Sequence, residues 1–205
     1  MKTARFEELV AFAQKKHKGQ TRACDAPAWH HLVRVSRLLT EILSVYKEGS
    51  VADRAALPRA ALGHDILEDT TATREEVTRL FGVREAALIW VLTNEEDDAH
   101  TDAYRKKVAE SDEAARILKL ADLYDNYTNV AYALPCLGAK WTHSYFLPIV
   151  EPMFARIRKT RFQAYRHTAG ALCLMVASSQ ALLAEALARD DGKRTRYSAQ
   201  RRKSS

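Results

Sequence analysis

The spacing of the apolar residues constrains the fold most, because it follows the period of an α-helix in most segments. Phe6, Leu9, Val10 and Ala13 fall at i, i+3, i+4 and i+7, which places them on one helix face. The same spacing recurs over residues 32–46. No segment alternates apolar and polar residues for long, and no internal repeat is visible. The sequence therefore predicts an all-α fold.

Glycines and prolines mark the expected helix ends, and only seven Gly and five Pro occur in the 205 residues. Thr73 and Glu76 form a capping box, which is typical of a helix start. Pro135 is expected to break a long helix, and Pro148 and Pro152 are expected to bend or divide the next one. The other predicted helices cover residues 52–67, 74–81, 83–92, 117 to beyond 126, 141–158 and 164–189.

Basic residues are concentrated at the C-terminal end. The net charge is +6, and residues 193–205 contain six Lys and Arg and no acid. The rest of the chain is therefore neutral, which argues against a nucleic-acid-binding face on the fold. Residues 191–205 are expected to form a disordered, solvated tail, because like-charged terminal runs usually do. An anion-binding arm is the alternative interpretation.

Neither a membrane segment nor a disulfide is expected. The longest apolar run, residues 169–177, is too short for a bilayer, which needs about 20 apolar residues. Acidic residues stand near the N-terminus, where a signal peptide needs an apolar stretch. Cys24, Cys136 and Cys173 are odd in number and widely separated, so a disulfide framework is not expected. A reducing compartment, the cytoplasm, fits this pattern.

The densest polar group lies in an apolar neighbourhood, at His64, Asp65, Glu68 and Asp69. On a helix these four side chains would share one side of about two turns. Three carboxylates there would repel one another and would be costly to desolvate. A divalent cation would reverse that balance by supplying the opposite charge.

Two further groups complete a candidate metal site. Asp122 and Asn126 are four residues apart on a helix that should be mostly buried. His31 follows His30, and the two rings point in different directions on a helix, so at most one faces a given site. The candidate ligands are His31, His64, Asp65 and Asp122.

Two imidazoles and two carboxylates suit Mn, Fe, Zn or Ni better than Ca. Such an ion lowers the pKa of bound water and clamps phosphoryl oxygens, which predicts hydrolysis of a phosphate ester. Each residue alone also has a plain structural interpretation. A helical His is usually a core residue, and Asp122 could simply pair with Lys119. Only the combination, spread over three helices, favours a metal.

The order and spacing of these groups resemble the HD-domain hydrolases of the RelA/SpoT homologue family, especially the small stand-alone alarmone hydrolases. Residues 11–22 are similar to the family's A-x-x-x-H-x-G-Q-x-R segment, and residues 60–70 resemble A-x-L-L-H-D-x-x-E-D-T. Residues 119–126 resemble K-L-A-D-x-x-x-N, and Pro27 precedes His31 as in the family's P-Y-x-x-H-P element. The resemblance spans about residues 4–150.

The resemblance implies an all-α HD-domain bundle around one Mn²⁺, with the four candidate ligands above. Glu68 and Asp69 match the paired acids that position or activate the attacking water. Arg22, Asn126 and Tyr145 match residues near the nucleotide. The family's reaction removes the 3′-pyrophosphate from ppGpp or pppGpp and gives GDP or GTP and pyrophosphate. Some small members act on adenosine analogues or remove the 2′-phosphate of NADPH.

The sequence departs from the family pattern at several positions. Gly63 stands where Leu is common, Leu32 replaces a Pro, and Asp125 adds an acid beside Asn126. Residues 94–98 hold four acids where the family often carries a Lys, and such a loop is a poor cradle for a polyphosphate. Three basic residues could take its place, and we expect the middle one to contact substrate: Arg105, Lys106 and Lys107.

The expected organisation is a metal-dependent hydrolase domain over residues 1–160, a C-terminal helix over 161–190 that packs on it, and the tail. An apolar stripe at residues 172–176 is compatible with a homo-oligomer seam and equally with packing inside one chain. The expected partner is a guanosine polyphosphate, without a membrane. The alternatives are another nucleotide substrate (an adenosine alarmone, the 2′-phosphate of NADPH or a 5′-nucleotide) and a non-catalytic nucleotide-sensing module.

Overall fold

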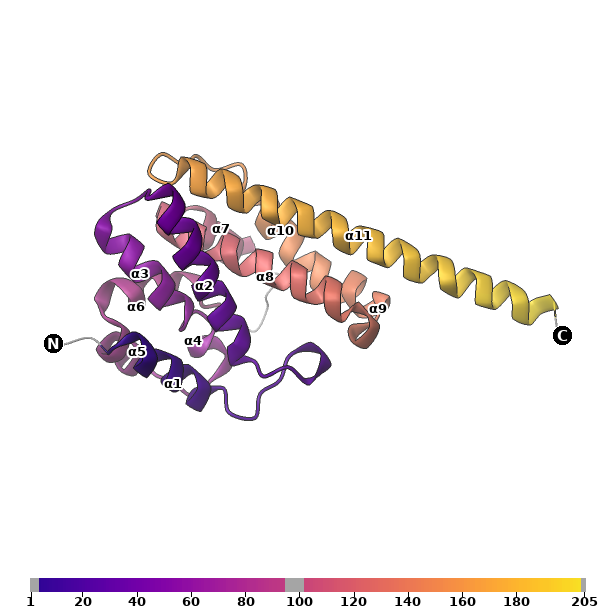
Figure 1. Cartoon of the computed structure of the whole chain (residues 1–205), viewed down its shortest axis with the longest axis horizontal. Coiled ribbons are helices and arrows are strands. Elements are labelled where there is room, and N and C mark those ends of the chain that lie inside the picture. Colours follow the sequence, from indigo (N-terminus) through magenta and orange to yellow (C-terminus); the bar gives the residue numbers. More distant parts are fainter. Residues whose placement is uncertain (1–3, 95–101, 204–205) are drawn as a thin grey trace.

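The chain folds into helices joined by short loops, and the all-α prediction is confirmed (Figure 1). The computed structural model describes residues 4–94 and 102–203, with side chains to residue 190, and these residues contain no strand beyond an isolated bridge between Thr21 and Pro27. The elements are α1 (Phe6–Lys16), η1 (Ala23–Asp25), α2 (Trp29–Tyr46), α3 (Val51–Ala61), α4 (Ile66–Asp69), α5 (Arg74–Phe81), α6 (Val83–Leu92), α7 (Asp102–Ala109), α8 (Glu113–Leu137), α9 (Ala139–Trp141), the π-helical turn η2 (Thr142–Phe146), α10 (Leu147–Ile157) and α11 (Arg166–Lys203).

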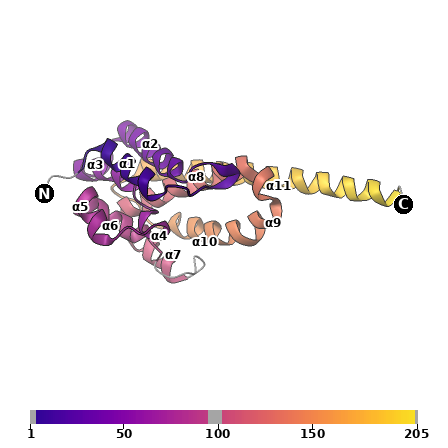
Figure 2. The same ribbon diagram turned by 90° about the horizontal axis from the view of Figure 1, so that it is seen from below.

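Helix α8 is the centre of the fold and contacts α2, α3, α6, α7, α10 and α11 (Figures 1 and 2). Most of its residues are buried, and Leu118, Leu120 and Ala121 are fully buried. Asp112 caps its start by accepting a hydrogen bond of 2.8 Å from the Ala115 N–H. A polar side chain in the middle of α8 is therefore delivered into the core.

Two helix breaks lie at other residues than the expected prolines. Helix α8 continues through Pro135 to Leu137 and stops at Gly138, whose φ of 80° is left-handed. Pro135 lies in the last turn, so few hydrogen bonds depend on it. The next helical stretch is divided by the wider turn of η2, and Pro148 lies in the first turn of α10, where its missing N–H costs little.

The predicted helix over residues 52–67 is wrong in its second half. Helix α3 ends at Ala61, residues 62–65 form a turn, and α4 is a separate single turn. Gly63 lies so close to neighbouring elements that an added Cβ would meet Ile89 at 2.7 Å and Phe81 at 2.8 Å. This tight packing explains why a glycine replaces the bulkier family residue here.

Helix α11 lies along α8 and then extends beyond the rest of the molecule (Figure 1, yellow). Leu172, Val176 and Leu183 are buried on its inner side. Its start is held by two carboxylates. Glu113 accepts backbone N–H groups of residues 163–165, and Glu48 accepts those of His167 and Thr168. The helix continues to Lys203, through most of the segment expected as a tail.

Part of α11, Arg166–Asp190, is long and apolar enough to span a membrane by length and composition, with a mean hydropathy of 1.7 in its most apolar window. It is longer than the expected run of residues 169–177 because a window average tolerates near-neutral residues such as Gly and Ser within an otherwise apolar segment. The window is 28% buried against the protein, and helices of soluble proteins pass the same test.

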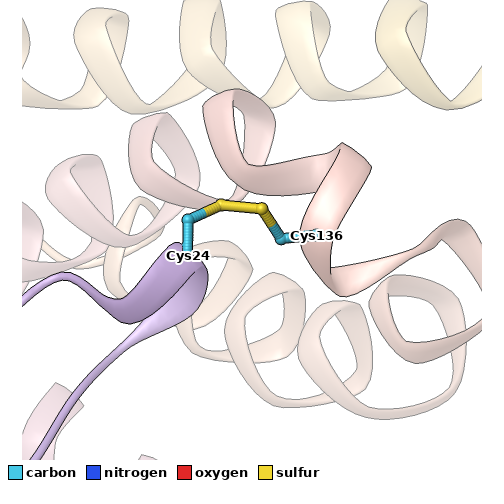
Figure 3. Close-up of a disulfide and its surroundings, with 2 residues drawn as sticks. All are labelled: Cys24 and Cys136. Carbon is cyan, nitrogen blue, oxygen red and sulfur yellow. A yellow bond between two sulfur atoms is a disulfide. The ribbon is translucent and has the colours of Figure 1, made fainter.

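A disulfide joins Cys24 in η1 to Cys136 in α8, so the expectation of no disulfide is wrong (Figure 3). The two cysteines are 112 residues apart in sequence, and the fold brings their Cα atoms to 5.8 Å. An odd cysteine count does not exclude one pair, and Cys173 is the free thiol. The bond connects the loop that contains Arg22 to α8.

Breaking this bond is expected to destabilise the protein by about 2–4 kcal/mol, because the oxidised unfolded chain contains a long closed loop. The Cys136→Ser variant and the reduced wild type should unfold at lower urea concentrations than the oxidised wild type. Cys173→Ser is the matched control and should retain the wild-type midpoint under oxidising conditions. Equal unfolding free energies for the oxidised and reduced protein would contradict the prediction.

The carboxylate of Glu48 gives the protein an acid-sensitive contribution to stability. Burial raises its pKa, but hydrogen bonds from His167 and Thr168 outweigh burial and lower the pKa to about 2. The pKa of Glu48 in the folded state is below its ordinary value of 4.5. Its contribution to stability is therefore complete above pH 4.5 and is lost as the pH falls towards 2. Glu48→Gln should cost about 1 kcal/mol at pH 7 and progressively less below pH 4.5. Urea unfolding across this range measures it, and Glu41→Gln on the exposed side of α2 is the control.

Candidate metal centre

Four side chains from α2, the 62–65 turn and α8 meet at one point. His31 comes from the first turn of α2, His64 and Asp65 from the turn, and Asp122 from the middle of α8. His31, His64 and Asp122 are only 1%, 2% and 3% exposed. The turn matters here because adjacent residues of a regular helix diverge by about 100°. In the turn, His64 Nε2 lies 3.1 Å from Asp65 Oδ1.

The distances between these side chains suit one shared cation. His31 Nε2 lies 3.1 Å from both His64 Nε2 and Asp122 Oδ1, and 3.6 Å from Asp65 Oδ2. His64 Nε2 lies 3.4 Å from Asp122 Oδ1. Two atoms bound at about 2.1 Å to one transition-metal ion lie about 3.0–3.4 Å apart at the usual coordination angles. Among the described residues, His31, His64 and Asp65 form a group that could hold a metal ion.

Both imidazoles point the same nitrogen at this cluster. His64 Nδ1 lies 2.8 Å from the Ala61 carbonyl oxygen, so it donates its N–H there and turns Nε2 inward. His31 Nδ1 lies 2.6 Å from Asp125 Oδ2, and its Nε2 also faces inward. Metal-ligating histidines show this arrangement, with one nitrogen on the ion and the other on an acceptor.

The electrostatics of the cluster favour positive charge. Burial lowers the pKa of His64, but Asp65 and Asp122 outweigh burial and raise it to about 9. Burial raises the pKa of Asp122, but Lys119 and the two imidazoles outweigh it and hold that pKa well below its ordinary value. Lys119 Nζ lies 2.8 Å from Asp122 Oδ2. The carboxylates thus stabilise a cation between them, whether an imidazolium or a metal ion.

Glu68 and Asp69 follow on α4 and add to the crowding of negative charge. Burial and then the charges of Asp65 and Glu68 raise the pKa of Asp69 to about 6. Burial likewise raises the pKa of Glu68. The Asn94 N–H donates to Glu68 Oε2 over 3.0 Å, which fixes that carboxylate. A divalent cation would relieve the repulsion in this group, so the donor set fits a metal.

A pocket of about 510 Å³ opens over the cluster, and Asp65, Glu68, Asp69 and Asp122 line it. Arg22 and Asn126 also line it, and Arg22 Nη2 donates to Asn126 Oδ1 over 2.6 Å. Nη1 of the same Arg22 guanidinium lies 3.7 Å from Asp65 Oδ2. The structure therefore brings eight of the ten predicted site residues to one pocket and the buried cluster at its base.

Two predicted substrate contacts do not reach this pocket. Lys106 Nζ lies at the surface, 3.9 Å from Glu110 Oε1, and its side chain is 65% exposed. Tyr145 is half-exposed, and its ring lies 5.5 Å from that of Trp141. The acidic loop expected at residues 94–98 lies, from residue 95 onwards, outside the described residues.

His17 is a further pocket residue, to which the sequence patterns assign no role. It is 2% exposed, and its Nδ1 lies 2.7 Å from Gln20 Oε1. Its Nε2 has no hydrogen-bond partner among the described residues, although the residue lines the pocket. The sequence marks it only as the histidine of the A-x-x-x-H-x-G-Q-x-R segment.

Comparisons with known proteins identify the family. The family described as "HD domain" matches residues 28–127, which include all four candidate ligands. The guanosine-3′,5′-bis(diphosphate) 3′-pyrophosphohydrolase MESH1 of Drosophila melanogaster is 33% identical over 138 residues, covering 65% of this chain and 73% of the fly protein. The chain belongs to the HD-domain family. It is an HD-domain hydrolase.

Other relatives agree with this placement of the HD-domain hydrolase. The MESH1 protein of Danio rerio is 29% identical over 142 residues, 68% of this chain and 75% of the fish protein. The GTP pyrophosphokinase rsh of Brucella melitensis is 32% identical over 132 residues, 60% of this chain but 16% of that protein. These matches confirm the relation to RelA/SpoT homologues.

A solved structure resembles this HD-domain hydrolase over most of its length. It is described as "A metazoan ortholog of SpoT hydrolyzes ppGpp and plays a role in starvation responses". The two chains are 26% identical with a TM-score of 0.67, and the match covers 87% of this chain and 95% of the other.

Proposed function

We propose that this HD-domain hydrolase removes the 3′-pyrophosphate from guanosine 3′-diphosphate alarmones and yields GDP or GTP and pyrophosphate. The observation that carries the proposal is the convergence of two imidazoles and two carboxylates at the base of a pocket lined by Glu68, Asp69 and Arg22. The names of the fly and fish relatives support this substrate for the family branch.

The cofactor in this proposal is one Mn²⁺, held by His31, His64, Asp65 and Asp122. Mixed imidazole and carboxylate ligands suit Mn²⁺ among other transition metals. When bound, such an ion polarises phosphoryl oxygens and makes a nearby water more acidic.

Glu68 and Asp69 are the proposed catalytic residues, because they stand beside the cluster on the pocket wall. The pKa values of both carboxyl groups are raised towards neutral pH, and a general base works best when its pKa lies near the operating pH. The Asn94 N–H orients Glu68 towards this task. Asp69 is held from its backbone, since its carbonyl accepts the Gln20 amide at 2.6 Å.

Arg22 and Asn126, which line the same pocket, are the proposed substrate contacts. The hydrogen bond to Asn126 holds the guanidinium of Arg22 at the pocket, where a planar cation pairs well with phosphate. Lys119 adds a second cation on the pocket wall. Lys106 and Tyr145 remain predictions that would need a movement of α7 or of η2 to contact substrate.

The test is pyrophosphate release from ppGpp and pppGpp by the purified protein with Mn²⁺, Zn²⁺, Mg²⁺ or EDTA. An adenosine alarmone, NADPH and 5′-GMP are assayed in parallel for pyrophosphate and phosphate release. The proposal expects Mn²⁺-dependent release of pyrophosphate from ppGpp. Turnover of another nucleotide alone would reassign the substrate, and nucleotide binding without any turnover would favour a sensor.

We further propose that the enzyme acts in the cytoplasm, where guanosine nucleotides are abundant. The disulfide is unusual for a reducing compartment, so the cysteine pattern no longer supports this location. Fractionation of cells after rapid thiol trapping tests both points, because it reports where the protein is and whether Cys24 is oxidised there.

A further inference from the structure

Asp125, the acid that the family pattern lacks, contacts the candidate ligand His31 on the side away from the cluster. Asp125 lies on α8 three residues after Asp122, and the residue is 8% exposed. Its Oδ2 lies 2.6 Å from His31 Nδ1, on the side of the ring away from the cluster. His31 Nε2 is the atom that faces Asp122 and His64. The imidazole of His31 therefore bridges Asp125 and the candidate cation site.

Arg34 fixes the other side of the same carboxylate. Its Nε donates to Asp125 Oδ1 over 2.7 Å, and its Nη2 donates to Oδ2 over 2.9 Å. This two-pronged contact holds the plane of the carboxylate as well as its position. Arg34 lies one turn after His31 on α2, so the arginine, the acid and the imidazole form a continuous chain from the surface to the cluster.

The position of the Asp125 carboxylate decides which His31 nitrogen can hold a metal. A neutral imidazole has one N–H, and the hydrogen-bond partner of one nitrogen determines where that N–H lies. A carboxylate is only an acceptor, so it keeps the N–H on Nδ1 and leaves the Nε2 lone pair for the ion. The carboxylate also makes the ring a stronger electron donor than His64, whose partner is the Ala61 carbonyl.

We propose that Asp125, held by Arg34, is a positioning residue that keeps the His31 N–H on Nδ1 and thereby sets the affinity of the centre for its cation. The proposal rests on the metal centre of the proposed function. A purely structural role would be an ion pair that joins α2 to α8, and the experiment must separate the two.

The test measures Mn²⁺ affinity of the full chain by titration, without nucleotide, for wild type, Asp125→Asn and Asp125→Glu. Removal of such a partner typically weakens metal affinity by about 10–100-fold. We expect a loss of that size in Asp125→Asn and partial recovery in Asp125→Glu. Asp53→Asn is the matched control. Asp53 Oδ1 pairs with Arg84 Nε over 2.8 Å, and neither residue belongs to the cluster or lines its pocket. It should retain wild-type affinity.

Nitrogen-15 NMR of the Zn²⁺-loaded protein gives a second readout. In wild type, His31 should show an N–H at Nδ1 with the downfield proton shift of a short hydrogen bond, and this signal should be lost in Asp125→Asn. Wild-type Mn²⁺ affinity in Asp125→Asn, or a His31 N–H on Nε2 in wild type, would overturn the proposal while leaving ppGpp hydrolysis intact. If wild type binds no Mn²⁺ or Zn²⁺, the metal centre itself is wrong and this proposal fails with it. Should Asp125→Asn not fold, the wild-type NMR signal decides.

Discussion

Replacing Asp65 with asparagine is expected to lower kcat/KM for ppGpp by on the order of 10³-fold, together with the loss of tightly bound metal. Asp65 is the best ligand to change because its side chain is 28% exposed, whereas that of Asp122 is 4% exposed. Removing Asp122 would leave Lys119 as a buried unpaired charge and would cost about 3–5 kcal/mol. With Asp65→Asn, lost activity can be attributed to the centre.

The measurement combines metal content of the purified variant with pyrophosphate release at saturating Mn²⁺. Glu110→Gln is the control, since its carboxylate is 66% exposed and Glu110, the residue directly after α7, does not line the pocket. It should retain both the metal and the rate. An Asp65→Asn protein that binds one equivalent of Mn²⁺ and hydrolyses ppGpp at the wild-type rate would remove Asp65 from the ligand set.

Replacing Glu68 with glutamine is expected to lower kcat by about 10²–10⁴-fold, the usual contribution of a positioned general base. The amide has the shape of the carboxylate but cannot accept a proton from water at neutral pH. Because Glu68 is not a proposed ligand, the variant should keep its Mn²⁺ and still bind ppGpp. This combination of retained binding and lost turnover distinguishes it from Asp65→Asn.

Single-turnover kinetics and Mn²⁺ titration of Glu68→Gln check this expectation. Glu85→Gln provides a comparison for a partly buried carboxylate, since it pairs with Arg59 Nε at 2.8 Å and does not line the pocket. A rate within a few-fold of wild type for Glu68→Gln would leave Asp69 as the candidate base. A loss of metal in this variant would instead assign Glu68 to the cation.

The sequence predicts the helices that have one buried stripe, because burial of such a stripe requires only local periodicity. This holds for α1, α2, α5 and α6. It fails at the end of α3, where Gly63 packs against Phe81 and Ile89 from later helices. Those neighbours are unknown until the chain is folded, so the His64–Asp65 pair looked helical although it lies in a turn.

The candidate ligands could be chosen from the sequence because buried carboxylates need a partner wherever they lie. The role of Asp125 could not be predicted from the sequence, since its contact with His31 joins residues from different helices. The disulfide was missed for the same reason, because 112 residues separate its cysteines. Lys106 was assigned by its distance along the chain, and the structure puts its ammonium at the surface of α7.

The bond between Cys24 and Cys136 closes a covalent ring that contains His31, His64, Asp65 and Asp122, whereas α11 lies wholly outside it. Even after unfolding, the oxidised chain keeps these four donors on one tether, which raises their effective concentration around a captured ion. Metal should therefore assist the oxidised protein in refolding more than the reduced one, and cleavage of the chain within α11 should leave that advantage unchanged.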